Sequence, residues 1–225
     1  LTEIMQAVGL PKPTVFRILT TLEEAGMLLR EPDAKRYVPG ERLANLAANV
    51  LLHSPHRSAR RAILEELVEK VGETCNLTIP NGHHVMYLDR VESSWPLRIN
   101  LHAGSKVPLY ASASGKLFLA HSPKRMRDRL LTNAPLIGHT KNTLTSLRQL
   151  ELEFTKIRRS GYAVDNEEYL AGICCLAVPV MNDQERVVAA VAVHGPVSRM
   201  SVSQAVEFLP TLKEAAEQIG QTLDW

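Results

Sequence analysis

The sequence is poor in cysteine and in aromatic side chains, and it carries almost no net charge. Of its 225 residues, three are cysteines and 5% are aromatic, and the formal net charge at pH 7 is +2. An odd number of cysteines, two of them adjacent (Cys174 and Cys175), argues against a disulfide framework and favours a reducing, cytoplasmic setting. The small net charge excludes binding of a polyanion through the overall field, so any nucleic-acid site must come from local geometry.

Long apolar runs are also missing. No run approaches the roughly 18 residues that a membrane-spanning helix needs, and no segment resembles a signal peptide. We therefore expect no membrane association. Apolar residues nevertheless make up 45% of the chain, which is enough for one large domain, or for a small domain and a larger one.

Residues 1–40 have the element order of a winged helix-turn-helix: helix, turn, helix and hairpin. Apolar residues at helical spacing predict a second helix from about Lys12 to Ala25, with Gly26 at its end. A hairpin follows, with extended arms at 27–30 and 36–38 around a turn-rich segment. The stripe of this helix that should face a core consists of Val15, Ile18, Leu19 and Leu22.

The opposite side of the second helix carries residues suited to duplex DNA. Thr14, Arg17 and Thr21 lie at offsets of three and four, so they share a face, and Lys12 extends it. A helix fits the major groove of B-DNA, where an arginine can bind guanine through two hydrogen bonds.

The hairpin could add contacts to those of the helix. In a winged module Arg30, Lys35 and Arg36 would lie near the flanking DNA backbone. The alternative is an ordinary solvated face, because residues 1–42 hold six basic and six acidic side chains and are not visibly basic. Periodicity alone leaves both interpretations open.

The rest of the chain indicates a linker and a larger mixed domain. Glu41 to Leu52 forms a helical pattern with one apolar seam, and the polar break that follows makes residues 41–57 a linker. Residues 58–225 alternate strand-like and helical patterns, and the last helix is expected to run from Ser203 to Leu223. The strand-like segments are 75–79, 84–91, 97–101, 162–169, 173–181 and 186–194.

The segment YASASGKLFLA, residues 110–120, places small residues before a helix that we expect Gly115 to open. Free N–H groups at a helix start favour an anion, so this segment could help to hold a small organic acid. The alternative is that the small residues only let a loop pack tightly, and on the residues alone this is the simpler interpretation.

Metal and catalytic chemistry are not expected. His83 and His84 are adjacent, as are the two neighbouring cysteines, and neither pair has the spacing of zinc ligands. The segment SASGK lacks the glycine spacing of a phosphate loop and the first glycine of a serine elbow. The acidic segment DNEE at 165–168 is typical of a hydrogen-bonded turn. We therefore expect no enzyme, no metal site and no cofactor.

Six segments of the chain, in order, resemble a known family. LTEIMQAVGLPKPTVFRILTTLEEAGML, with RYVPGERL after it, resembles the DNA-binding half of IclR-type bacterial transcriptional regulators. The resemblance continues through VGETCNL, VMYLDRVES, SASGKLFLA, RRSGYAVDNEEYLAGICCLAVPV and VAAVAVHGPVSRMS. It implies an α/β (α+β) fold: an N-terminal winged helix-turn-helix, a linker helix and a C-terminal GAF-like effector domain with an antiparallel sheet. The family's first helix should precede Leu1.

The resemblance also implies a function. A homodimer or a dimer of dimers should bind double-stranded operator DNA and repress a catabolic operon in response to a small organic acid. The DNA-binding residues would be Lys12, Pro13, Thr14, Arg17, Thr21 and Arg36. Pro13 stands where the family often has serine or threonine, so one hydrogen bond at the helix entry is in doubt. The alternative is a small-molecule sensor that signals through protein contacts and has a vestigial DNA-binding module.

Carried over by position, the effector-binding residues are Ala113, Ser114, Asp165, Ile173, Cys175, Ala192 and His194. Family members that bind small keto acids can have serines at the last two positions, so we expect a ligand of different size or polarity, such as an aromatic acid. His194 could donate to a carboxylate, and more strongly when protonated. Asp165, Cys175 and His194 could also converge on an incidental metal.

Overall fold

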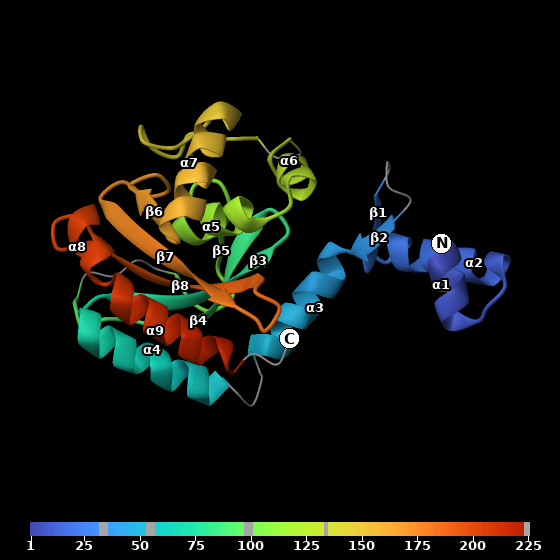
Figure 1. Cartoon of the computed structure of the whole chain (residues 1–225), viewed down its shortest axis with the longest axis horizontal. Helices are drawn as coiled ribbons and strands as arrows, with labels where there is room; N and C mark the ends of the chain where they lie inside the picture. Colours follow the sequence, from blue (N-terminus) through green and yellow to red (C-terminus); the bar gives the residue numbers. More distant parts are fainter. Residues whose placement is uncertain (32–35, 53–56, 97–100, 133–134, 223–225) are drawn as a thin grey trace. The chain divides into compact units, whose positions relative to one another are not determined.

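The computed structural model describes residues 1–31, 36–52, 57–96, 101–132 and 135–222. The chain divides into two compact units, Leu1–Leu51 and Leu52–Trp225 (Figure 1). Three sequence expectations lie outside the described residues: the hairpin turn with Lys35, the polar break at 53–56, and most of the strand-like segment at 97–101. Of the helices in the described ranges, none is long and apolar enough to cross a membrane.

The smaller unit has the expected order of two helices, a hairpin and a further helix. Its elements are α1 (Thr2–Val8), α2 (Lys12–Glu24), β1 (Leu28–Glu31), β2 (Arg36–Pro39) and α3 (Glu41–Leu52). β1 and β2 pair antiparallel. Gly9 and Gly26 follow the two helices with φ values of 65° and 68°, a left-handed conformation that glycine adopts without strain. The sequence prediction of a winged helix-turn-helix is confirmed.

The apolar stripe of α2 is buried only in part. Val15 and Leu19 are 2% and 4% exposed, but Ile18 is 44% exposed, so the prediction that Ile18 faces a core is wrong. Successive helix residues are about 100° apart, which places Ile18 about 60° from Val15, at the edge of the stripe. A module of this size has too few neighbouring elements to cover that edge.

The larger unit is built on a six-stranded antiparallel sheet with strand order β5-β4-β3-β8-β7-β6. Its strands are β3 (Thr74–Asn81), β4 (His84–Val91), β5 (Lys106–Pro108), β6 (Ala163–Asn166), β7 (Ile173–Met181) and β8 (Val187–Pro196). This arrangement confirms the expected mixed helix and sheet class.

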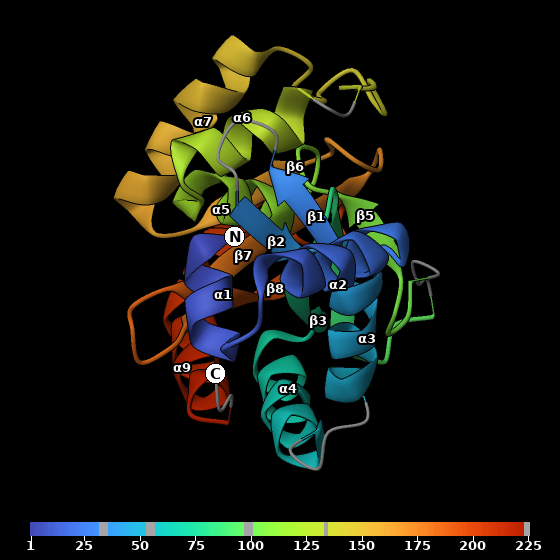
Figure 2. The same cartoon turned by 90° about the vertical axis from the view of Figure 1, so that its right-hand side faces the viewer.

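Helices cover both faces of this sheet (Figure 2). α4 (Arg57–Val71) and α9 (Leu209–Gly220) pack on one face, and α5 (Ala113–His121) packs on the other, with α7 (Leu147–Ser160) against it. α6 (Lys124–Thr132) lies on the same side as α5. The buried residues between the sheet and α5 form the core beside which the pocket described below opens.

Two helix boundaries differ from the sequence expectation. The helix expected from Ser203 to Leu223 is two helices, α8 (Val202–Glu207) and α9. Pro210 explains the break, because a proline lacks an N–H and clashes with the preceding turn, so it is tolerated only where a helix begins. α4 begins at Arg57, the last residue of the linker that the sequence predicts at 41–57.

Candidate functional site

A pocket opens on the sheet face that α5 covers. It encloses about 500 Å³ of space without atoms, part of which is open to solvent. All seven effector positions carried over from the family resemblance line it, and none is left outside. The pocket has further lining residues that were not predicted from the sequence, namely Asn76, Thr78, Val85, Tyr87, Leu101, Val107, Ser112, Tyr169 and Leu170.

The start of α5 forms one wall of the pocket. The helix begins at Ala113, not at Gly115, and Ser112 caps it, because the Ser112 Oγ accepts the Gly115 N–H at 3.3 Å. Gly115 has a different role: a Cβ there would lie 2.1 Å from the Leu109 carbonyl oxygen. Tight packing therefore explains Gly115, while Ala113 and Ser114 line the pocket at a helix start whose first N–H groups have no acceptor within the helix.

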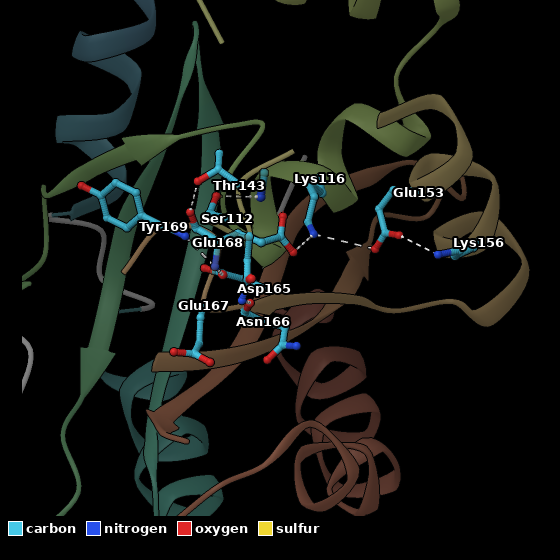
Figure 3. Close-up of polar contacts among 12 residues, drawn as sticks. Ser112, Lys116, Thr143, Glu153, Lys156, Asp165, Asn166, Glu167, Glu168 and Tyr169 are labelled. Carbon is cyan, nitrogen blue, oxygen red and sulfur yellow. Dashed lines mark hydrogen bonds and ion pairs between the residues drawn. The ribbon is translucent and has the colours of Figure 1, made fainter. Parts of the chain in front are cut away.

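The end of β6 and the turn after it form another wall. Asp165 Oδ1 accepts the N–H groups of Glu168 and Tyr169 at 2.7 and 3.4 Å, so the acidic segment is the hydrogen-bonded turn that the sequence predicts (Figure 3). Burial raises the pKa of the Asp165 carboxyl to about 7. At neutral pH this side chain is therefore protonated in part of the molecules and can then donate a hydrogen bond.

We expect Asp165→Asn to raise the melting temperature more at pH 8 than at pH 5. The folded pKa of about 7 lies above the ordinary value of 3.8, so the folded state keeps a proton that the unfolded chain loses between these values. The stability of the wild type therefore falls as pH rises through this window. The asparagine of the variant does not titrate, so the variant does not lose this stability. Thermal unfolding at both pH values should show a difference of about 5 °C or more, and equal shifts would contradict a buried titrating carboxyl.

A buried ion pair ties this turn to α5. Lys116 has no exposed surface, and its Nζ donates to the Glu168 carboxylate, while Glu153 Oε1 of α7 lies 3.7 Å away (Figure 3). The Thr143 hydroxyl donates to the Glu168 carbonyl at 2.6 Å. Lys116 belongs to the segment SASGK, and no spacing in the sequence indicates its partner 52 positions away.

The β3–β8 side of the pocket carries three buried polar side chains. Asn76, Arg90 and His194 are 1%, 9% and 4% exposed. Arg90 Nη1 lies 3.0 Å from Asn76 Oδ1 and 2.9 Å from His194 Nε2, and Asn76 Nδ2 lies 3.2 Å from His194 Nδ1. Burial, and then the charge of Arg90, lower the pKa of His194 to about 3. The ring is therefore neutral at pH 7, and any hydrogen bond that it donates to a carboxylate comes from the neutral imidazole.

A β-bulge brings Arg90 to this side of the sheet. Tyr87 lines the pocket, and a side chain three positions further along a regular strand would face the other way. The register between β3 and β4 shifts between Leu77 and Thr78, where β4 has one extra residue. Arg90 therefore lies on the same side of the sheet as Tyr87. Asp89 points to the opposite face, where Arg57 and Arg60 of α4 bind its carboxylate.

The pocket does not combine its histidine, cysteine and carboxylate into a metal site. Asp165 pairs with Cys175, and Cys175 pairs with His194, on three neighbouring strands. Across the ranges that the structure describes, no group of three or more histidine, cysteine, aspartate or glutamate side chains could hold a metal ion.

The residues expected to contact DNA lie on α2 and β2. Thr14 is half-buried, and the others are exposed, namely Lys12, Pro13, Arg17, Thr21 and Arg36. The Thr21 hydroxyl donates to the Arg17 carbonyl oxygen at 3.0 Å, within the helix. Arg17 therefore presents its guanidinium at the surface of the helix that a winged module inserts into DNA.

A winged helix-turn-helix unit joined to a larger α/β unit with a pocket is an arrangement typical of transcriptional regulators. Residues 1–32 match the family model described as IclR helix-turn-helix domain, and residues 48–221 match the one described as Bacterial transcriptional regulator IclR C-terminal. The chain therefore belongs to the IclR family of bacterial transcriptional regulators, whose members are regulators rather than enzymes.

Individual relatives agree with this membership. The chain is 45% identical over 222 residues to the probable transcriptional regulator SauR of Cupriavidus necator, covering 99% of this chain and 88% of the relative. It is 29% identical over 221 residues to the transcriptional repressor IclR of Escherichia coli, covering 97% and 81%. The solved structure of Thermotoga maritima IclR is similar with a TM-score of 0.72, at 35% identity, covering 100% of this chain and 90% of that one.

A second solved structure bears on the pocket. It is an IclR homolog from Microbacterium hydrocarbonoxydans complexed with 4-hydroxybenzoate, with a TM-score of 0.67 and 26% identity. The similarity covers 99% of this chain and 90% of that one.

Proposed function

We propose that this protein represses a catabolic operon and that a small organic acid in the pocket changes its affinity for operator DNA. The observation that carries the proposal is the convergence of the seven effector positions on one hollow of about 500 Å³. Two relatives support it: the Escherichia coli one is named a repressor, and the Microbacterium one is complexed with an aromatic acid. In this proposal residues 1–40 bind DNA, residues 41–57 link, and residues 58–225 sense the effector.

We propose that the protein binds DNA as a homodimer or a dimer of dimers. Two copies would place two α2 helices in successive major grooves of a palindromic operator. Leu46 and Val50 of α3 support pairing of copies, because they are 52% and 63% exposed in the single chain and belong to one apolar seam. Pairing of this seam between copies would bury them.

A ligand can change operator affinity only if it binds DNA-competent and DNA-incompetent arrangements with different affinities. Such couplings typically amount to about 1–3 kcal/mol, which corresponds to about a 5- to 150-fold change in operator affinity. The effector changes the affinity for operator DNA by the same factor by which the DNA changes the affinity for the effector. A titration with either one therefore measures this factor.

We expect candidate acids to shift operator binding of the wild type and to lose about tenfold or more in affinity in His194→Ala and Ser114→Ala. Both replacements remove a polar group that lines the pocket. The measurement is fluorescence anisotropy on DNA from upstream of the gene, with pyruvate and 4-hydroxybenzoate as first acids. Met126→Ala, an exposed position on α6, serves as the control. Unchanged acid affinity in both pocket variants would exclude this pocket.

The second candidate is a sensor that signals through protein contacts and keeps a vestigial DNA-binding module. The balance of six basic and six acidic side chains in residues 1–42 favours it. Salt dependence separates the two candidates: a regulator loses operator affinity steeply as salt rises and keeps a sequence preference, whereas a vestigial module shows neither.

A further inference from the structure

Asn76, Arg90 and His194 form a triangle of short contacts that cannot all be hydrogen bonds, because in one of them two donors face each other. All three of its contacts are 3.2 Å or shorter, and all three side chains are at least nine-tenths buried. Buried polar groups at such distances are normally paired donor to acceptor. Each of the three contacts therefore calls for one acceptor.

Only two acceptors are present for these three contacts. Asn76 supplies Oδ1, a neutral imidazole supplies one unprotonated nitrogen, and a guanidinium supplies none. When Arg90 donates to Oδ1 and to Nε2, the proton of His194 is on Nδ1 and faces the Asn76 amino group. Turning the amide around, or choosing the other tautomer, moves the conflict to another contact without removing it.

We propose that this corner of the pocket binds the acidic group of the effector, an inference that rests on the proposed function. An oxyanion, whether carboxylate or sulfonate, has acceptors and no donors, so it takes hydrogen bonds from Asn76 and His194 at once. Both of these residues line the pocket. Arg90 stands behind them as a positioning residue, because it holds Asn76 Oδ1 and His194 Nε2.

Hydrogen bonds from Asn76 and His194, more than a free positive charge, would hold the oxyanion. Glu92 Oε1 lies 3.4 Å from Arg90 Nε and already neutralises part of the arginine charge. Asp165 lies two strands away from His194, beyond Cys175. Two strand spacings amount to about 10 Å, so the acidic group of a ligand held at the corner does not meet the Asp165 carboxyl.

Asn76→Asp tests the inference with almost no change of shape. A carboxylate at position 76 supplies acceptors to both Arg90 and His194, which satisfies all three contacts, and it repels an incoming oxyanion. We therefore expect the unliganded full chain to melt at or above the wild-type temperature. The affinity for acids should nevertheless fall by about 10- to 100-fold.

The measurements are thermal shift and isothermal titration calorimetry on the full chain. The probes are benzoate, 4-hydroxybenzoate, pyruvate and ethanesulfonate, with benzamide and pyruvamide as matched neutral compounds. The carboxylates and the sulfonate separate the two sources of an oxyanion. Asn81→Asp is the matched control, because it makes the same change on β3 at a residue outside the pocket lining, and acid affinity should not change.

The inference is wrong if an acid binds the wild type and Asn76→Asp with equal affinity. It is also wrong if the wild type binds a neutral amide as tightly as the matching acid. Both outcomes leave the proposed function standing. Weaker binding together with a lower melting temperature assigns Asn76 a purely structural role and also overturns the inference. No response of the wild type to any acid overturns both the inference and the proposed function.

If Asn76→Asp does not fold, a measurement on the wild type can still test whether an acid binds at this corner. The ring nitrogen resonances of His194 in a ¹⁵N spectrum report its hydrogen bonds directly. Saturation with a binding acid should shift the protonated nitrogen, because its partner changes from a donor to an acceptor. Unchanged His194 resonances in saturating acid would overturn the inference.

Discussion

Replacing Lys116 by methionine should lower the free energy of unfolding by about 3–5 kcal/mol. Lys116 has no exposed surface, and its ammonium group lies between the carboxylates of Glu168 and Glu153 (Figure 3). Methionine fills much of the same volume but cannot donate a hydrogen bond or carry charge. The variant therefore leaves Glu168, whose side chain is only 9% exposed, as a buried carboxylate without its cation.

This loss should depend on pH and on Glu168. Burial raises the pKa of Glu168 and Lys116 lowers it, so removal of the lysine raises that pKa further. The folded variant then keeps a proton that the unfolded chain has lost, and its stability falls as pH rises. We expect the deficit to shrink at low pH. The double variant Lys116→Met/Glu168→Gln should recover more than half of it, because no buried charge remains.

Urea unfolding followed by tryptophan fluorescence measures the effect on the right unit, since Trp95 and Trp225 both belong to Leu52–Trp225. Lys124→Met is the matched control: it breaks an exposed pair with Asp128, which should contribute only about 0–1 kcal/mol. A loss of the same small size in Lys116→Met would show that solvent screens the Lys116 pair as well.

The ion pair also matters for the pocket. Asp165, Tyr169 and Leu170 belong to the turn that Glu168 anchors, and all three line the pocket. Ala113 and Ser114 line it from the helix that carries Lys116. A single buried contact therefore holds two walls of the candidate effector site at a fixed separation, and its loss should weaken acid binding as well as stability.

The sequence was sufficient to predict most of the fold and the seven lining positions of the pocket. Helical spacing predicted α2, the strand-like pattern predicted β7 and β8, and the family resemblance indicated which pocket positions converge. Two predictions failed for local reasons. Pro210 divides the last helix into two, and Ile18 stays exposed because the smaller unit has too few elements to bury it.

The rest of the site depends on contacts that no sequence pattern encodes. Arg90 reaches the pocket side only because a bulge interrupts the alternation of β4, and a strict period of two assigns it to the other face. Asn76 lies in a strand whose pattern predicts a buried core segment. Its role depends on contacts with Arg90 and His194, which are 14 and 118 positions away in the sequence. The neutral state of His194 follows from the same neighbours.

Arg17→Ala should weaken specific operator binding by about 1–3 kcal/mol, or about 5- to 150-fold. Arg17 is exposed on α2, on a face with Thr14 and Thr21 and away from the buried Val15 and Leu19. A guanidinium there can bind guanine through two hydrogen bonds, and alanine removes both. The assay is a gel shift on the operator and on scrambled DNA of equal length, at several salt concentrations.

Two matched variants show whether geometry or charge is responsible. Arg17→Lys keeps the charge but cannot form the planar pair of hydrogen bonds, so it should retain affinity for scrambled DNA and lose preference for the operator. Arg148→Ala removes the same charge from an exposed position on α7, and operator affinity should stay at the wild-type level. Equal operator affinity of Arg17→Ala and wild type would show that α2 does not read the operator through Arg17.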